Sequence, residues 1–301
     1  MLRSTSVKND LWKPVKLLAR QSFEGSAIAS SCSSRGDLVA VLTDFNLNIF
    51  NNRELLEIIK LEGGKKVHVT EDATSIFVIT SDKLICYNSW GKVKWELNEI
   101  DTNSHFSISP SGNTIIISKG NNIKILNRFG DVKEQANFDT NILSISQYKQ
   151  NIIVLTENSI NIFKLIDKIT KVAGAKYSKI YSSKDGIIAI SNDLLSSFSY
   201  SGNEIWSKDY KITKFSFSNQ GIKHVFVKDS KTLMCQDRNG DQLWEYTSRE
   251  KFDGAFAIES GEMVGIFSNK AFHVIDGSGQ QSWSYQAREK VINFSFPNYG
   301  G

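Results

Sequence analysis

Basic side chains gather in a few short segments between apolar runs, and their type and spacing point to binding chemistry. They are Lys176, Lys179, Lys208, Lys211, Arg249, Lys251, Arg288 and Lys290. Nearby acids such as Asp209, Glu250, Asp253 and Glu289 offset them in part. Clustered exposed cations raise the local potential and speed encounter with an acidic surface. We therefore predict that these eight residues contact a partner; the alternative is a solvated, solubilising rim.

The remaining reactive side chains form no recognisable catalytic or metal-binding pattern. The four histidines are His68, His105, His224 and His273, and they lie far apart in the sequence. No GxSxG, HExxH, P-loop or GxGxxG motif occurs. The prediction is a protein with no catalytic residue, no metal site and no cofactor.

The three cysteines, Cys32, Cys86 and Cys235, never form a CxxC pair, and each sits in an apolar, strand-like run. This pattern predicts buried thiols in a reducing compartment. The first 18 residues lack the apolar core of a secretory signal. We therefore expect a cytoplasmic protein.

Composition excludes several protein classes. The chain has 301 residues, 40% of them apolar and 23% charged, which is ordinary for a globular protein. No apolar run approaches the roughly 18 residues of a membrane span, so we expect no membrane insertion. The formal net charge of +4 is too small to favour nucleic-acid binding.

A repeat organises the whole chain. A glycine stands four residues before a tryptophan at Gly91/Trp95, Gly202/Trp206, Gly240/Trp244 and Gly279/Trp283. The last three tryptophans are 38 and 39 residues apart, and Trp206 follows Trp95 by 111 residues, or three steps of 37. Within that gap Gly130 opens a similar segment, with Glu134 in the tryptophan position.

Each period also contains four short apolar runs separated by turn residues. FSIS (106–109), TIIIS (114–118) and IKILN (123–127) illustrate the first three, and the fourth carries the tryptophan. Such β-branched runs are typical of strands. ELLEIIKLEGG (54–64) and KLIDKITKVAG (164–174) have helix-like spacing, but their place in the repeat predicts fourth strands.

Four-stranded units at this period are the signature of a β-propeller. We predict an all-β fold: one propeller domain over residues 1–301 with seven four-stranded blades, starting near 26, 66, 104, 141, 178, 212 and 254. We expect each glycine to supply a positive φ, and each tryptophan to lie on the next blade. Segments 9–25 and 291–297 look like extra strands, which leaves an eight-bladed ring, or a natural chain that continues beyond Gly301, as alternatives.

The Gly-x-x-x-Trp segments resemble the repeat of quinoprotein-like (pyrroloquinoline-quinone-type) propellers, and FSISPSGNTIIIS (106–118) resembles the inner-strand segment of WD-like repeats. The resemblance covers about residues 9–296. The WD dipeptide and its Gly-His partner are absent, as is the adjacent cysteine pair of some quinone-dependent dehydrogenases. The resemblance therefore implies the fold and not the cofactor.

Three functions remain open at this stage. The favoured one is a non-enzymatic scaffold for protein–protein interaction, the usual role of propellers that lack catalytic residues. The second is a nucleic-acid-associated propeller that uses a basic rim. The third is a small-ligand binder or an enzyme that uses the central channel, which the Ser-, Ala- and Ile-rich inner strands do not favour because they offer few titratable groups.

Overall fold

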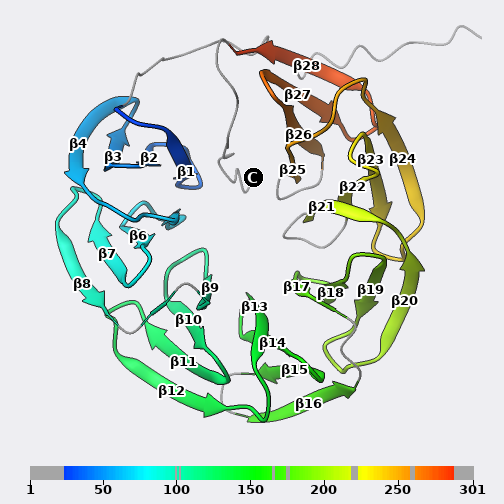
Figure 1. The fold of residues 1–301 in the computed structure, drawn as a ribbon, viewed down its shortest axis with the longest axis horizontal. Helices are drawn as coiled ribbons and strands as arrows, with labels where there is room; N and C mark the ends of the chain where they lie inside the picture. The colour runs from blue at the N-terminus through cyan, green and yellow to red at the C-terminus, as the bar shows by residue number, and fades with distance from the viewer. Residues whose placement is uncertain are drawn as a thin grey trace, which may run out of the picture.

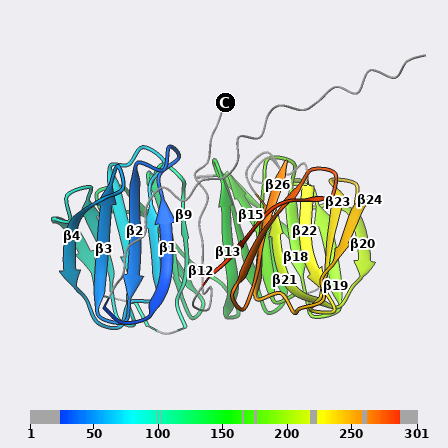
Figure 2. The same ribbon diagram turned by 90° about the horizontal axis from the view of Figure 1, so that it is seen from above.

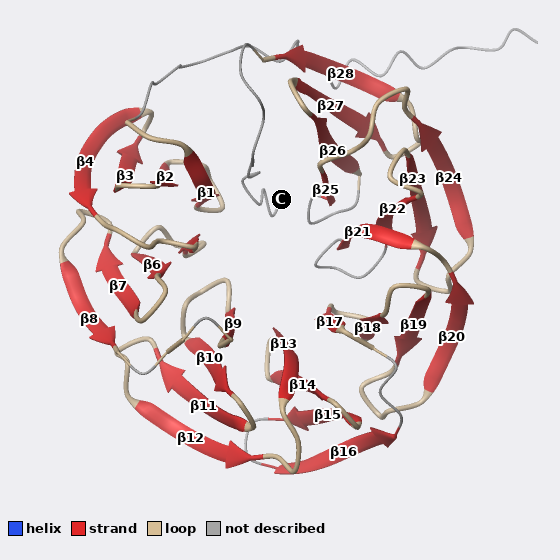
Figure 3. Cartoon of the chain, in the orientation of Figure 1, coloured by secondary structure: helices blue, strands red, loops and turns tan. Residues whose placement is uncertain are grey.

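The computed structural model describes residues 24–98, 100–101, 103–164, 167–173, 177–217, 223–257 and 262–287, without the side chains of 167–171, 173 and 217. These residues form seven antiparallel, four-stranded sheets set as blades around a central axis (Figure 1). No helix occurs in these ranges (Figure 3), so none is present there to cross a membrane. The predicted all-β, seven-bladed propeller is confirmed. Two predicted extra strands cannot be compared with the structure, because residues 9–23 of the first and the whole of the second, 291–297, lie outside the described residues.

Within each blade the four strands follow one another from the axis outward. Blade 1 contains β1 (Ala27–Cys32), β2 (Leu38–Thr43), β3 (Asn46–Asn51) and β4 (Glu54–Lys60). Blade 2 contains β5 (Lys66–Val69), β6 (Ser75–Ile79), β7 (Leu84–Asn88) and β8 (Val93–Leu97). Blade 3 contains β9 (His105–Ile108), β10 (Thr114–Lys119), β11 (Asn122–Asn127) and β12 (Val132–Asn137). Blade 4 contains β13 (Ile142–Tyr148), β14 (Asn151–Thr156), β15 (Ser159–Lys164) and β16 (Asp167–Ala173).

Blades 5 to 7 repeat the arrangement. Blade 5 contains β17 (Lys179–Ser182), β18 (Ile187–Ile190), β19 (Leu194–Phe198) and β20 (Glu204–Asp209). Blade 6 contains β21 (Ile212–Phe217), β22 (Lys223–Lys228), β23 (Thr232–Asp237) and β24 (Gln242–Thr247). Blade 7 contains β25 (Gly254–Ala257), β26 (Met263–Ser268), β27 (Ala271–Asp276) and β28 (Gln281–Gln286). The helix-like segments at 54–64 and 164–174 thus form β4 and β16, as their place in the repeat predicted.

The core lies between blades, in a ring of sheets seen edge-on in Figure 2. Alternate residues of a strand face opposite sides of the sheet, yet every residue of β6 is buried. One face of β6 packs with blade 1, where Ile76 joins Ala40 and Ile49. The other face packs with blade 3, where Phe77 joins Ile115. The second and third strands therefore read as continuous apolar runs because both of their faces are covered.

Serine side chains join the inner strands of neighbouring blades. The innermost strand is an edge of its sheet, so the N–H groups along its free edge need partners outside the sheet. The Ser146 hydroxyl of β13 accepts a hydrogen bond from the Ser182 N–H of β17 (2.9 Å). Ser31 does the same for the N–H of Val69 (2.9 Å), and Ser216 for that of Ala257 (3.0 Å). The serines that recur in the first run of the repeat thus satisfy backbone donors of the next blade.

Tryptophan and glycine form a second contact between blades, on the outer rim. Trp95, Trp206 and Trp244 occupy the same fourth-strand position, beside a β-bulge. A Cβ on Gly240 of blade 6 would lie 2.9 Å from the Trp206 ring of blade 5, and Gly240 has a φ of +81°. Only glycine meets both conditions without strain. Gly130 with Trp95, and Gly279 with Trp244, repeat the contact.

Two of these indole rings also hydrogen-bond across the interface. The Trp95 Nε1–H donates to the Arg128 carbonyl (3.0 Å), and the Trp206 Nε1–H donates to the Arg238 carbonyl (2.9 Å). Each tryptophan thus fixes the turn between the third and fourth strands of the following blade. The expected packing of the rings on the next blade is confirmed for Trp95, Trp206 and Trp244.

We expect Trp244→Ala to lower the free energy of unfolding by about 3–5 kcal/mol, because a large buried ring at a blade interface is lost. Urea unfolding followed by fluorescence measures the change. Trp90→Ala is the matched control: its side chain is 62% exposed, so its effect should stay within about 0.5 kcal/mol. Equal effects of the two substitutions would contradict this role of Trp244.

Candidate partner-binding site

Four of the eight predicted basic residues lie exposed where the fourth strand of one blade leads to the first strand of the next. Lys179 is the first residue of β17, and Lys211 immediately precedes β21. Arg249 and Lys251 lie between β24 and β25. Lys176, Arg288 and Lys290 fall outside the described residues.

Lys208 has a different place from the one predicted. It lies within β20, which continues to Asp209, and not in the connection that follows. Its side chain is part-buried, and its Nζ donates a hydrogen bond to the Gly240 carbonyl of blade 6. Lys208 therefore joins blades 5 and 6 instead of presenting a free charge. The sequence pattern missed this because it does not show how far a side chain reaches across an interface.

A cavity of about 470 Å³ opens where the inner strands of blades 5, 6 and 7 converge. We call it the channel mouth. Its lining comes mainly from the ends of β17, β21 and β25, which Figure 1 shows next to one another near the axis. Its lining includes the predicted Lys179 and also Lys214, which the prediction omitted.

Aromatic rings line the channel mouth. Tyr181 and Phe215 lie 5.1 Å apart between centroids, and Phe256 stacks on Phe267 at 6.4 Å. Phe256 is 37% exposed, so part of its ring is available for contact. Burial raises the pKa of the Tyr181 hydroxyl, which keeps this side chain neutral at physiological pH. The mouth thus offers apolar contact area close to charged groups.

The charges at the channel mouth are unbalanced. Among the described residues, none forms a hydrogen bond or an ion pair with the ammonium groups of Lys179, Lys211 and Lys214. Asp253 also lines the mouth, but one of its carboxylate oxygens accepts a hydrogen bond from the Asn269 N–H (2.8 Å). Among the described residues that line the mouth, the two lysines thus outnumber the one carboxylate, Asp253.

Lys214 and Phe256 are the binding candidates that sequence reasoning missed. Both lie in first strands, Lys214 in ITKFSF and Phe256 in GAFA. The lysine inside an otherwise uncharged inner-strand run was the available signal, whereas Phe256 gave none, because other first strands also carry an aromatic residue. The prediction considered only the connections between blades.

Two of the four histidines, His68 and His224, have largely buried rings that are held neutral. Burial lowers the pKa of both His68 in β5 and His224 in β22 to about 4. His68 Nε2 and His224 Nδ1 are buried without a hydrogen-bond partner among the described residues. Among all the described residues, no group of three or more His, Cys, Asp or Glu side chains could hold a metal ion.

Two cysteines are buried as predicted. Burial raises the pKa of the Cys86 thiol to about 11 and that of the Cys235 thiol to about 12. Because the thiolate is the reactive form, both groups are poor nucleophiles at neutral pH. Cys32 is only partly buried.

Comparisons with known proteins agree with this architecture. A family model described as outer membrane protein assembly factor BamB matches residues 184–296, the part of the chain that carries the last three Gly-x-x-x-Trp segments. Over these residues the chain is similar to PQQ-type β-propeller repeats. A search of curated proteins finds no match to this propeller.

Solved propellers resemble the whole ring. Sqt1 of Saccharomyces cerevisiae superposes with a TM-score of 0.73 at 9% identity, over 90% of this chain and 88% of that protein. Hsv2 of Kluyveromyces lactis gives 0.68 at 12% identity, over 87% and 99% of the two chains. BamB of Moraxella catarrhalis gives 0.62 at 12% identity, over 85% and 81%. At these identities the similarity concerns the fold.

The buried histidines predict an acid-sensitive propeller. In the unfolded chain His68 and His224 take up protons near pH 6.5, whereas in the folded protein they do so only near pH 4. Stability should therefore be constant above about pH 7 and fall between pH 6.5 and 4, by about 1.4 kcal/mol per pH unit for each histidine. Urea midpoints across this range measure the slope.

The double variant His68→Leu/His224→Leu should show a flatter decline between pH 6.5 and 4, whatever its stability at pH 7.5. A wild-type propeller equally stable at pH 7 and pH 5 would contradict the buried, neutral state of these histidines.

Proposed function

We propose that this propeller is a non-enzymatic, cytoplasmic scaffold that binds an acidic segment of a partner protein at the channel mouth. The observation that carries the proposal is the combination of two ammonium groups, on Lys179 and Lys214, that no described residue pairs with, and an aromatic lining that includes Phe256. An acidic segment with apolar or aromatic side chains would satisfy both features. Lys211, Arg249 and Lys251 extend the positive surface along the same connections.

Several features support a protein partner over the two other functions. The described residues that line the mouth include neither a histidine nor a cysteine, the usual general base and thiol nucleophile of enzymes. The net charge of +4 is modest, whereas proteins that bind a phosphate backbone usually carry a concentrated basic face. A nucleic acid could still stack on the exposed ring, so it remains the second candidate.

Charge reversal at the mouth tests the proposal. We expect the variant Lys179→Glu/Lys214→Glu to capture its partner from a lysate of the source organism at least tenfold less than the wild type does. Quantitative mass spectrometry of the captured proteins measures the difference. Capture by the wild type should weaken between low and physiological salt, because exposed charges are screened beyond about 8–10 Å.

The control is Lys92→Glu/Lys133→Glu, which makes the same charge change at exposed positions on the outer rim of blades 2 and 3. It should capture the partner as the wild type does. Nuclease treatment before capture separates the two candidates: loss of the partner after that step would assign the mouth to nucleic acid. Equal capture by the wild type and all variants would contradict the proposal and indicate that these lysines only keep the surface soluble.

A further inference from the structure

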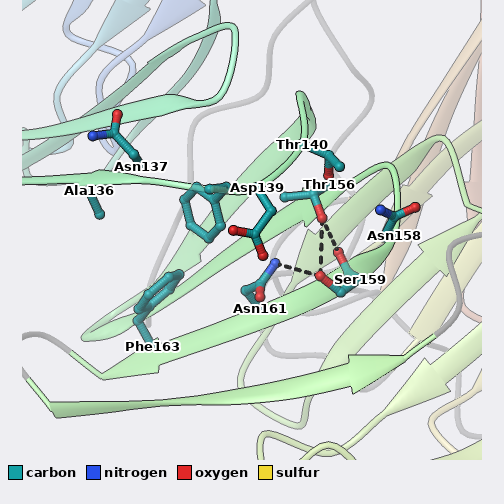
Figure 4. A pocket seen from close by; sticks show the side chains of 10 residues that line it. Ala136, Asn137, Asp139, Thr140, Thr156, Asn158, Ser159, Asn161 and Phe163 are labelled. Atoms are coloured by element: carbon teal, nitrogen blue, oxygen red, sulfur yellow. Dashed lines mark hydrogen bonds between the residues drawn. The ribbon is translucent and has the colours of Figure 1, made fainter.

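A second cleft, of about 360 Å³, lies between blades 3 and 4 (Figure 4). One wall is the end of β12 and the connection that follows it, which includes Asp139 and Thr140. The other wall is the turn between β14 and β15 together with β15 itself, including Asn158 and Asn161. No residue of the channel mouth contributes to this cleft.

Blade 3, which forms one wall of the cleft, lacks the tryptophan of the repeat. The fourth-strand position that holds Trp95 in blade 2 holds Glu134 in blade 3. An apolar contact between blades 3 and 4 comes from Phe138 of the connection and Phe163 of β15, which meet edge to face at 5.8 Å and 82°. Both rings line the cleft and both are partly buried.

One wall of the cleft is held by hydrogen bonds that are already satisfied. The buried Asn161 Nδ2 donates to the Val154 carbonyl (3.3 Å) and to the Ser159 hydroxyl (3.1 Å). Thr156 donates its hydroxyl to the Ser159 carbonyl (3.2 Å). These bonds fix the wall in place and use the donors of the Asn161 amide and of the Thr156 hydroxyl.

Polar groups on both walls of the cleft have no partner among the described residues. Among the described residues, none hydrogen-bonds or ion-pairs with the side chains of Asp139, Thr140 and Asn158. Figure 4 shows the Asp139 carboxylate pointing into the cleft, toward Asn161. Beside them, the Glu157 carboxylate accepts a hydrogen bond from Asn141 Nδ2 (3.2 Å) and pairs with no described cation. The cleft therefore carries negative charge beside aromatic rings.

We propose that this cleft binds the guanidinium group of an arginine side chain on a partner protein. Guanidinium is planar, stacks on aromatic rings and donates several hydrogen bonds in fixed directions. Asp139 supplies a carboxylate for a charge-assisted pair, while Thr140 and Asn158 supply neutral oxygens. Phe138 and Phe163 supply the apolar surface. This site stands apart from the acidic-segment site at the channel mouth and does not depend on it.

Titration with small probes tests the assignment. N-acetyl-arginine N-methylamide, added to the isotope-labelled propeller, should shift the NMR signals of Thr140 and Asn158 and saturate in the millimolar range. The citrulline analogue has nearly the same shape without the charge, and it should bind at least fivefold more weakly. Free L-arginine forms a separate arm, because tighter binding of the free amino acid by tenfold or more would indicate a metabolite site and overturn the partner assignment.

Asp139→Asn should weaken binding of the arginine probe at least fivefold. The matched control is Asp241→Asn, an exposed aspartate in blade 6, which should leave binding unchanged. The variant Lys179→Glu/Lys214→Glu should also bind the probe normally, so a failure of the channel-mouth proposal is distinguishable from a failure here. Equal binding of the arginine and citrulline probes, or an Asp139→Asn variant that binds like the wild type, would overturn the proposal.

Discussion

Lateral contact between blades is the constraint on which the rest of this structure depends. A four-stranded sheet in this chain has apolar side chains on both faces of its middle strands, as β6 shows with Ile76 on one side and Phe77 on the other. Such a sheet is stable only between two neighbours. Serine hydroxyls at the inner edges, as between blades 1 and 2, and Trp–Gly contacts at the outer rim, as between blades 5 and 6, then help to set the position of one blade against the next.

The two sites proposed for binding differ in their relation to this repeating constraint. At the channel mouth, the first strand β21 carries an exposed lysine, Lys214, which lines the cavity. In blade 3, which forms one wall of the cleft, Glu134 stands in the tryptophan position. Both sites carry a charged side chain, Lys214 or Asp139, that forms no hydrogen bond or ion pair with a described residue.

The repeat could be predicted from sequence because period, turn residues and apolar runs are local properties. They placed a strand at Glu54–Lys60 against its helix-like spacing, and they assigned Trp206 and Trp244 to blade interfaces. The binding surfaces depend on lateral geometry, which local patterns do not contain. Lys208 was misplaced for this reason. Its strand continues to Asp209, and its ammonium group donates a hydrogen bond to a carbonyl in another blade. The cleft of Asp139 was invisible for the same reason, since its walls come from different blades.

The Trp–Gly contact has a direction, and this bears on how such a ring is assembled over evolutionary time. Blade 6 carries both halves: Gly240 receives the indole of blade 5, and Trp244 extends to Gly279 of blade 7. A tandem copy of blade 6 would therefore present a matching surface to each neighbour and to the original. Gene duplication can thus lengthen a series of such units without any new interface. A blade that carries Glu134 instead of tryptophan lacks this interchangeability, so the sequences on either side of it must change together.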